Sequence, residues 1–301
     1  MELRHLRYFI AVAEELHFAR AAERLHIEQS PLSRAIKELE HVLSVQLFER
    51  TTRSTRLTWA GQVFLEDVRR VFITIDQAKA SVKAAATGYR GILRIALSDS
   101  VAQPRLAALL ARCREEEPDV EIRLFEKPLS QQIKGLRSGL YDAGFAQSDD
   151  VGQGIVAEPV WSDALVVAVP ARHPLLAHKR IPLDEVLRYP LVLCQPEMCE
   201  GYCRQIEAVL RSANTQPIVA EYVATLDLMM TLVTAGYGLG FASASQIPVC
   251  RHQEVVARPL AGRSPMLTTY LLRPDIDPSE QLNRFMDRAN PAKPPARDNP
   301  A

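Results

Sequence analysis

Residues 18–61 read FARAAERLHIEQSPLSRAIKELEHVLSVQLFERTTRSTRLTWAG, and this stretch decides the fold of the N-terminal part of the chain. Its apolar residues recur at helical spacing in two short runs, which are separated by a turn at residues 26–28. The second run forms one apolar stripe, made of Leu32, Ile36, Leu39 and Leu43. Two short helices joined by a tight turn, the second with a polar and basic outer face, are typical of a helix-turn-helix.

The polar face and the segment after it supply the candidate DNA-binding residues. On the second helix these are Gln29, Ser30, Ser33, Arg34 and Lys37, and after it Arg50, Arg53 and Arg56. Arginine can bond guanine through two donors and glutamine can read adenine, so Arg34 and Gln29 suit base contacts. The later arginines alternate with Thr and Ser, which suits a basic hairpin, or wing, lying along phosphates together with Ser33. For Arg34 and Lys37 the alternative is that they are ordinary solvated surface charges.

Composition sets the broad class of the protein. At 301 residues the chain should hold two or more domains, and 47% hydrophobic residues allow sizeable cores. The formal net charge is +0, but residues 1–90 carry 14 basic and 11 acidic residues, which is compatible with a nucleic-acid partner. The N-terminus has no apolar signal segment, and no stretch is long enough to span a membrane. With only five cysteines, we expect reduced thiols and a cytoplasmic location.

A heptad pattern follows the predicted wing. Apolar residues recur at alternating steps of four and three, at Phe64, Val68, Val71, Ile75, Ala78, Val82 and Ala85. Such a seam indicates either a helix lying on its own domain or a helix that pairs with a second chain. We favour pairing, because no apolar partner segment follows directly and Gly88 and Gly91 end the helix.

From Gly91 onward, predicted strands alternate with predicted helices. The strands are 92–97, 120–125, 142–146, 165–169, 191–194, 219–223, 239–242 and 268–272. The helices are 103–117, 129–139, 202–212, 226–235 and 278–288. This alternation predicts an α/β domain with a mostly parallel sheet. The glycine-rich run 236–240 follows a helix and precedes a strand, which is the reverse of a dinucleotide fingerprint, so we interpret it as a helix cap and turn. The tail from Asn290 is too polar to fold.

The front of the chain resembles the winged helix-turn-helix of LysR-type transcriptional regulators. The features that agree at fixed spacing are Ala21-Ala22, Leu25, Gln29, Ser33, Leu39-Glu40, Leu47-Phe48, Arg50, Arg53, Leu57-Thr58 and Ala60-Gly61. Three residues depart from the pattern: Glu28 replaces a small capping residue, Ser44 a glycine, and Trp59 a Glu or Pro. Glu28 is a weak N-cap, and Ser44 must adopt the turn geometry that glycine would take.

The resemblance implies a domain plan. It predicts a winged helix-turn-helix at 1–58, a linker helix for dimerisation at 59–89 and an effector domain at 90–301, similar to periplasmic solute-binding proteins. That domain has two lobes: lobe I at about 90–163 and 267–290, and lobe II at about 164–266. The implied partners are double-stranded DNA, a small effector, RNA polymerase and further copies in a homodimer or homotetramer. No cofactor and no membrane partner is expected.

The effector pocket of the resembling family lies between the lobes. Three predicted helix starts, near Ser98 to Ser100, near Gly201 and near Thr225, should face this cleft and offer free N–H groups. The corresponding residues here are Ser98, Ser100, Lys127, Gln147, Gln195 and Thr225. The alternative is that the Ser and Thr residues simply cap their helices.

Other functions find less support in the sequence. No Ser/His/Asp or Cys/His set stands out, and the seven histidines show no metal-ligand spacing, so we expect neither an enzyme nor a metal site. An enzyme or a plain solute-binding protein on the two-lobed domain is disfavoured by the N-terminal module. A thiol-based redox sensor using Cys194, Cys199 and Cys203 is the alternative regulator, but close spacing alone is weak support and we expect unreactive thiols.

Overall fold

The structure is a computed structural model, and it describes residues 1–50, 54–98, 101, 103–213, 215–248, 254–262 and 264–290. The chain forms two compact units, Met1–Val82 and Lys83–Ala301. Each unit has its own hydrophobic core, so the two are described separately.

The N-terminal unit is a winged helix-turn-helix, as the sequence predicts. It contains α1 (Leu3–Glu15), α2 (Phe18–Arg24), α3 (Gln29–Leu43), the antiparallel pair β1 (Phe48–Arg50) and β2 (Thr55–Leu57), and most of α4 (Trp59–Ala86). The apolar stripe of α3 is buried against α1 and α2, with Phe9 at the centre of the shared core. Burying this stripe holds the other face of α3 toward the outside.

The structure shows the backbone environment of Ser44 and Glu28, which depart from the pattern, and of Gly61, which agrees with it. Ser44 ends α3 with φ 53° and ψ 29°, the left-handed conformation that favours glycine. Glu28 precedes α3 without forming a side-chain cap. Gly61 allows α4 to approach the wing closely, because a Cβ there would lie 2.2 Å from the carbonyl oxygen of Leu47.

The heptad seam of α4 has two different environments. Phe64 and Val68 pack against the N-terminal core. For this part of the seam the structure agrees with the alternative interpretation, in which the helix lies on its own domain. Further along, Val71 is 41% exposed and Val82 71% exposed, and Ala78 and Ala85 are also exposed. The exposed apolar face of α4 therefore begins at Val71.

The C-terminal unit is built on a mixed sheet. Its strands lie in the order β10-β6-β11-β5-β3-β4, with β9 also paired to β6. Their bounds are β3 (Gly91–Leu97), β4 (Val120–Glu126), β5 (Ala143–Ala146), β6 (Ile155–Pro170), β9 (Gly240–Ser243), β10 (Val255–Pro259) and β11 (Met266–Pro274). The prediction of a mostly parallel sheet is wrong for this mixed sheet. β3 pairs in parallel with β4 and β5, but β6 and β11 run antiparallel to their neighbours.

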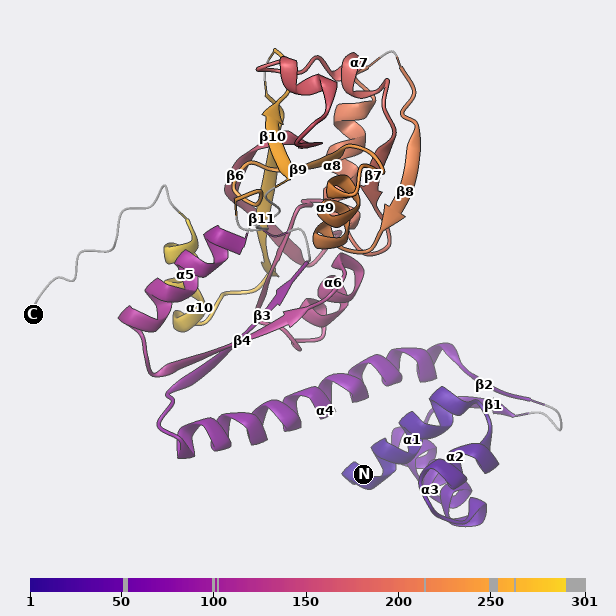
Figure 1. The fold of residues 1–301 in the computed structure, drawn as a ribbon. Coiled ribbons are helices and arrows are strands. Elements are labelled where there is room, and N and C mark those ends of the chain that lie inside the picture. Colours follow the sequence, from indigo (N-terminus) through magenta and orange to yellow (C-terminus); the bar gives the residue numbers. More distant parts are fainter. Residues whose placement is uncertain are drawn as a thin grey trace, which may run out of the picture. The chain divides into compact units, whose positions relative to one another are not determined.

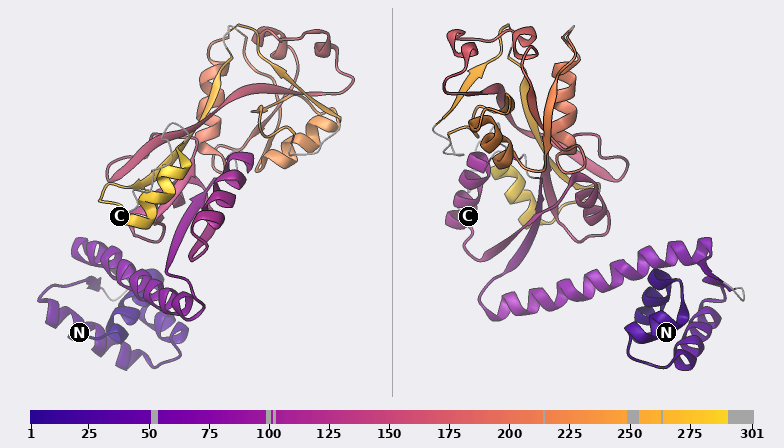
Figure 2. Two further views of the ribbon diagram at one scale, coloured as in Figure 1. Left: turned by 90° about the vertical axis from the view of Figure 1, so that its left-hand side faces the viewer. Right: turned by 45° about the vertical axis from the view of Figure 1, so that its right-hand side comes forward.

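Helices cover the sheet in two lobes. Lobe I holds α5 (Gln103–Glu116), α6 (Leu129–Arg137) and α10 (Glu280–Ala289), with α5 and α10 side by side (Figure 1). Lobe II holds η1 (Pro174–Ala177), α7 (Leu183–Val186), α8 (Glu200–Leu210) and α9 (Leu226–Thr234), together with the parallel pair β7 (Leu191–Cys194) and β8 (Val219–Val223). The long strands β6 and β11 extend from one lobe into the other (Figure 2). Gly236 follows α9 with φ 81°, which confirms the predicted helix cap.

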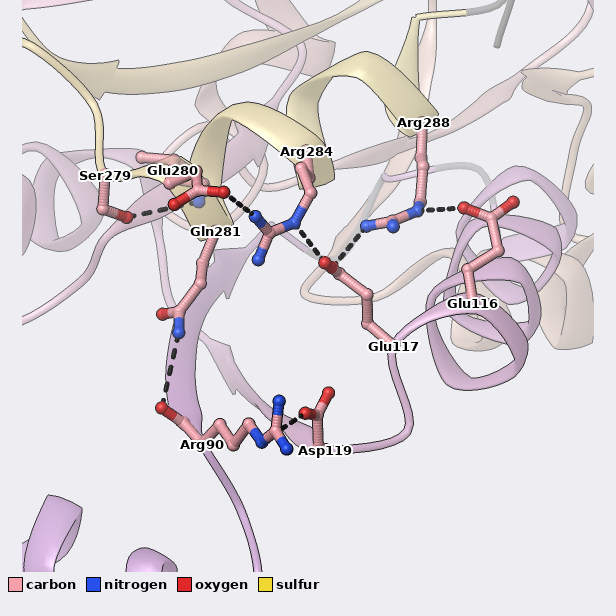
Figure 3. Close-up of polar contacts among 10 residues, drawn as sticks. Arg90, Glu116, Glu117, Asp119, Ser279, Glu280, Gln281, Arg284 and Arg288 are labelled. Atoms are coloured by element: carbon pink, nitrogen blue, oxygen red, sulfur yellow. Dashed lines mark hydrogen bonds and ion pairs between the residues drawn. The ribbon is translucent and has the colours of Figure 1, made fainter. Parts of the chain in front are cut away.

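Within lobe I, an ion-pair network fastens α10 to the C-terminal end of α5 (Figure 3). Arg288 bonds Glu116 and Glu117, at 2.7 Å to the latter, and Arg284 bonds Glu117 and Glu280. Only 10% of the Arg288 side chain is exposed. Its hydrogen bond lowers the pKa of Glu116 below the usual 4.5 despite an opposing effect of burial. Residues more than 160 positions apart in the chain are thus held together by charged groups.

Candidate functional site

The recognition face is the polar side of α3. Its five residues line one shallow depression of about 440 Å³, and they are Gln29, Ser30, Ser33, Arg34 and Lys37. All but the half-buried Ser33 are exposed. Among the described residues, Gln29, Arg34 and Lys37 have no hydrogen bond or ion pair with another side chain. Five of the eight predicted residues therefore share one outward face, and the side-chain donors of Gln29, Arg34 and Lys37 on it are free.

Arg50 has protein partners within the N-terminal unit. Its guanidinium lies 3.0 Å from the carboxylate of Glu40 and 4.5 Å from the centre of the Phe18 ring. The other oxygen of Glu40 accepts hydrogen bonds from the backbone N–H groups of Leu47 and Phe48, at 2.9 and 3.1 Å. This arrangement joins α3 to the start of the wing. Arg56 is exposed on β2, whereas Arg53 lies outside the described residues.

The candidate effector residues of lobe I gather at one edge of the sheet. Ser98, Lys127 and Gln147 each follow the carboxyl end of a strand, β3, β4 and β5 respectively. The backbone N–H of Ser98 donates to Phe145, and that of Lys127 donates to Leu97. Lys127 is exposed, whereas Ser98 and Gln147 are buried. Ser100 lies outside the described residues.

The candidate residues of lobe II lie at the equivalent edge of β7 and β8. The backbone N–H of Gln195 donates to the carbonyl oxygen of Val223 at 2.7 Å, two residues before Thr225. The hydroxyl of Thr225 caps α9 by accepting a hydrogen bond from the backbone N–H of Leu228 at 3.2 Å. Capping is the alternative role that the sequence left open, but this bond uses only one acceptor position of the hydroxyl.

The start of α8 forms the contact between the two lobes, a role that the sequence analysis missed. A Cβ at Gly201 would lie 2.6 Å from the backbone carbon of Gln147, so only glycine permits this approach. Gln205 donates to the carbonyl oxygens of Gln147 and Thr268 at 2.7 and 2.8 Å, and accepts from the Thr268 N–H at 2.9 Å. The available signal was a glycine in the first turn of a helix, where it lowers helix propensity without an evident local reason.

Gln147 also carries a buried acceptor. Its side chain is 3% exposed, and its Oε1 has no hydrogen-bond partner among the described residues. A buried amide oxygen without a partner is costly, so it is a candidate for a ligand's hydrogen-bond donor.

The described cysteines are buried thiols. These are Cys113, Cys194, Cys199 and Cys203, and Cys250 lies outside the described residues. Burial, with smaller contributions from Cys199, Glu207 and Glu197, raises the pKa of Cys203 to about 12. Since the thiolate is the reactive form, this environment opposes redox chemistry at Cys203.

Other kinds of site find no basis in the described part of the chain. Those residues contain no group of three His, Cys, Asp or Glu side chains placed to hold a metal ion. Within the same ranges, no helix combines the length and the hydropathy that crossing a bilayer requires.

Comparison with known proteins matches both parts of the chain. Residues 3–62 match the family described as bacterial regulatory helix-turn-helix protein, lysR family, and residues 86–292 match the LysR substrate binding domain. The uncharacterized HTH-type transcriptional regulator YnfL of Escherichia coli is 35% identical over 81% of this chain and 83% of its own length. AlsR of Bacillus subtilis is 34% identical over 81% of both chains.

A solved structure extends the similarity to the full chain. Full-length CbnR in complex with its target DNA has a TM-score of 0.71 and 27% identity, covering 96% of this chain and 99% of its own.

Proposed function

We propose specific roles for the candidate residues of this chain, which belongs to the LysR family of transcriptional regulators. The family is one of DNA-binding regulators with an effector-binding domain, not of enzymes. The observation that carries the proposal is the exposed polar face of α3, on which the side chains of Gln29, Arg34 and Lys37 have no hydrogen-bond or ion-pair partner among the described residues. We place this face in the major groove of the operator.

Within that groove the residues have different tasks. Arg34 and Gln29 read base edges, and Lys37 and Ser30 extend the same contact face. Ser33, Arg53 and Arg56 hold phosphates, which orient the helix without reading sequence. Arg50, already bonded to Glu40, fixes the angle of the wing and presents its remaining donors to the backbone.

Assembly uses the linker helix, which we assign to residues 59–89. Pairing involves the exposed Val71, Ala78 and Val82 and the half-buried Ile75 between them, because an apolar face of this length is unfavourable in water. Phe64 and Val68 support it from the N-terminal core. The dimers join into a homotetramer, which acts in the cytoplasm and contacts RNA polymerase at the promoter.

The effector binds between the lobes of the domain at 90–301. Ser98, Ser100, Lys127 and Gln147 contribute from lobe I, and Gln195 and Thr225 from lobe II. The buried Oε1 of Gln147 accepts a hydrogen bond from the ligand, which supplies the partner it lacks. A ligand that changes the contact between α8 and residue 147 changes the relation between the lobes, and through it the spacing of the DNA contacts.

The DNA arm of the proposal is tested by fluorescence anisotropy with the DNA beside the protein's own coding region. We expect tight binding whose affinity falls steeply with salt, as phosphate contacts require.

Val71→Glu buries a charge in the dimer seam and should reduce the mass measured by light scattering, while Glu66→Gln, on an exposed side of the same helix, should not. Unchanged mass and solubility in Val71→Glu would contradict the pairing helix.

The effector arm begins with a thermal-shift screen of metabolites on the wild type. Gln147→Leu and Thr225→Val then remove one hydrogen-bonding group from each lobe. Each should weaken the effector that the screen finds by about 0.5–1.5 kcal/mol, and leave operator binding without effector unchanged. Loss of operator binding with intact effector affinity would show that these residues serve folding instead.

A further inference from the structure

Two carboxylates at the end of α1 pair with arginines of other helices in the N-terminal unit. One oxygen of Glu14 lies 2.8 Å from the guanidinium of Arg24 on α2, and its other oxygen lies 3.2 Å from that of Arg69 on α4. Among the described residues, the carboxylate of the neighbouring Glu15 pairs with α2 alone, at 3.4 Å from Arg24 and 3.7 Å from Arg20. Of the ion pairs in this part of the chain, those of Glu14 are the ones that connect α2 with α4.

The carboxylate of Glu14 is held from both sides. Burial raises the pKa of this group, but its hydrogen bonds with Arg24 and Arg69 outweigh that effect, and the pKa lies below the usual 4.5. Hydrogen bonds between an arginine and a carboxylate have preferred lengths and directions, so they fix an angle as well as a distance. Glu14 therefore defines how α4 lies relative to α2.

The ion pair of Arg69 lies where α4 leaves the N-terminal core. Before it, apolar residues of α4 such as Leu65 and Val68 pack against the core, and after it Phe72 is the last described residue of the helix to do so. The exposed seam begins at Val71. Apolar contacts are non-directional, so they hold two surfaces together without fixing the angle between them. The ion pair supplies a directional contact at this point.

A dimer on DNA needs a fixed geometry between its two recognition helices. The half-sites of a dimeric helix-turn-helix protein lie about 34–36 Å apart along the duplex. In the proposed dimer the exposed seam of α4 holds the two chains together, and α2 leads into α3 through the turn at residues 25–28. The angle between α4 and α2 therefore sets the distance and direction from one α3 to the other.

We propose that Glu14, through its bonds with Arg69 and Arg24, is a positioning residue that sets which half-site spacing the dimer accepts. The role rests on the proposed function, because it requires pairing through α4 and DNA binding through α3. Glu14 makes no contact with DNA in this arrangement and acts through the two helices that it joins. Exposed ion pairs contribute little to stability, and 34% of the Glu14 side chain is exposed, so its removal should change geometry more than folding.

Operators with altered spacing test this role. Anisotropy titrations use the DNA beside the protein's own coding region, with zero, one or two base pairs inserted at the centre of the segment that the protein protects from nuclease. Two base pairs turn one half-site by about 70° around the duplex relative to the other. We expect the wild type to bind this DNA about tenfold more weakly, and Glu14→Ala and Arg69→Ala to reduce the loss to about threefold or less. Affinity for a duplex that carries a single half-site should not change.

Two neighbouring residues provide matched controls. Glu15→Ala removes a carboxylate that pairs with α2 and not with α4. Arg70→Ala removes an arginine of α4 that pairs with Asp67 of the same helix, at 3.4 Å. Both variants should discriminate among the spacings as the wild type does. Glu14→Gln, which keeps the size of the side chain and loses its charge, is the second variant in case Glu14→Ala fails to fold, as judged by circular dichroism.

The outcomes separate this role from a structural one and from the proposed function. Full discrimination in Glu14→Ala and Arg69→Ala would overturn the positioning role and leave the proposed function intact. Equal weakening on all three duplexes, with a lowered melting temperature, would overturn it as well, because the ion pairs would then serve folding alone. A wild type that binds all three duplexes equally would overturn the paired arrangement on which both proposals rest.

Discussion

The helices α3 and α8 are both amphipathic, but the polar face of α3 is exposed and the polar face of α8 contacts another part of the chain. In α3 the face is free: Gln29, Arg34 and Lys37 have no side-chain partner among the described residues. In α8 the face is used inside the chain, where Gln205 makes three hydrogen bonds to lobe I. These three residues of α3 are thus available to a partner, whereas Gln205 of α8 holds the two lobes of the effector domain together. Substitution of each should therefore affect different properties.

The largest effect is expected where charged groups hold distant segments together. Arg288→Ala leaves Glu117 largely buried without one of its partners and should lower the free energy of unfolding by about 3 kcal/mol. Urea unfolding followed by the fluorescence of Trp161 measures this, in a Trp59→Phe background so that one tryptophan reports. Arg34→Ala, the same change on the free face, should leave the curve unchanged. Equal curves for both variants would remove the distinction between polar residues that are bonded inside the chain and those that are left free for a partner.

A smaller loss is expected at the contact between the lobes. Gly201→Ala places a Cβ against the backbone of Gln147 and should destabilise the domain by about 2 kcal/mol, within the range for overpacking. Arg211→Ala, at an exposed position just after the same helix, serves as the control. A gain in stability from the better helix propensity of alanine would mean that α8 can move away from residue 147 at little cost.

The free face of α3 should show its effect only with DNA. Arg34→Ala should cost about 1–2 kcal/mol of discrimination between the operator and a scrambled sequence, and leave stability intact. Anisotropy titrations on both DNAs give this difference directly. Lys37→Ala provides the comparison on the same face. If Arg34→Ala discriminates as the wild type does, α3 is not the helix in the groove.

The smallest effect, none within error, is expected from oxidation of the lobe II thiols. With a pKa of about 12, Cys203 is almost entirely protonated at pH 7–8, and Cys194 and Cys199 are buried, so peroxide should leave operator affinity unchanged. Reactivity toward iodoacetamide should rise about tenfold for each pH unit, because the thiolate fraction does. A reversible loss of binding that disappears in Cys199→Ser would restore the redox sensor as the better explanation.

Local periodicity was enough to predict the helix-turn-helix and most strands and helices of the effector domain, and the alternation of arginines with Thr and Ser predicted the wing. An apolar stripe such as Leu32, Ile36 and Leu39 encodes a buried face within a single element, and glycine or Ser44 at a turn encodes a backbone angle. The free face of α3 was predictable for the same reason, since it is what remains when the stripe is buried. These features depend on neighbours a few positions apart.

Only the tertiary structure decided which residues form contacts with distant parts of the chain. It paired Arg50 with Glu40, placed Phe64 and Val68 on the N-terminal core, and turned β6 and β11 antiparallel to their neighbours. It also brought Gly201 against residue 147 and joined Glu14 to arginines of two other helices. Each of these depends on which segments meet in space, and no spacing along a single chain specifies that, because the same residue types serve equally well on a solvated surface.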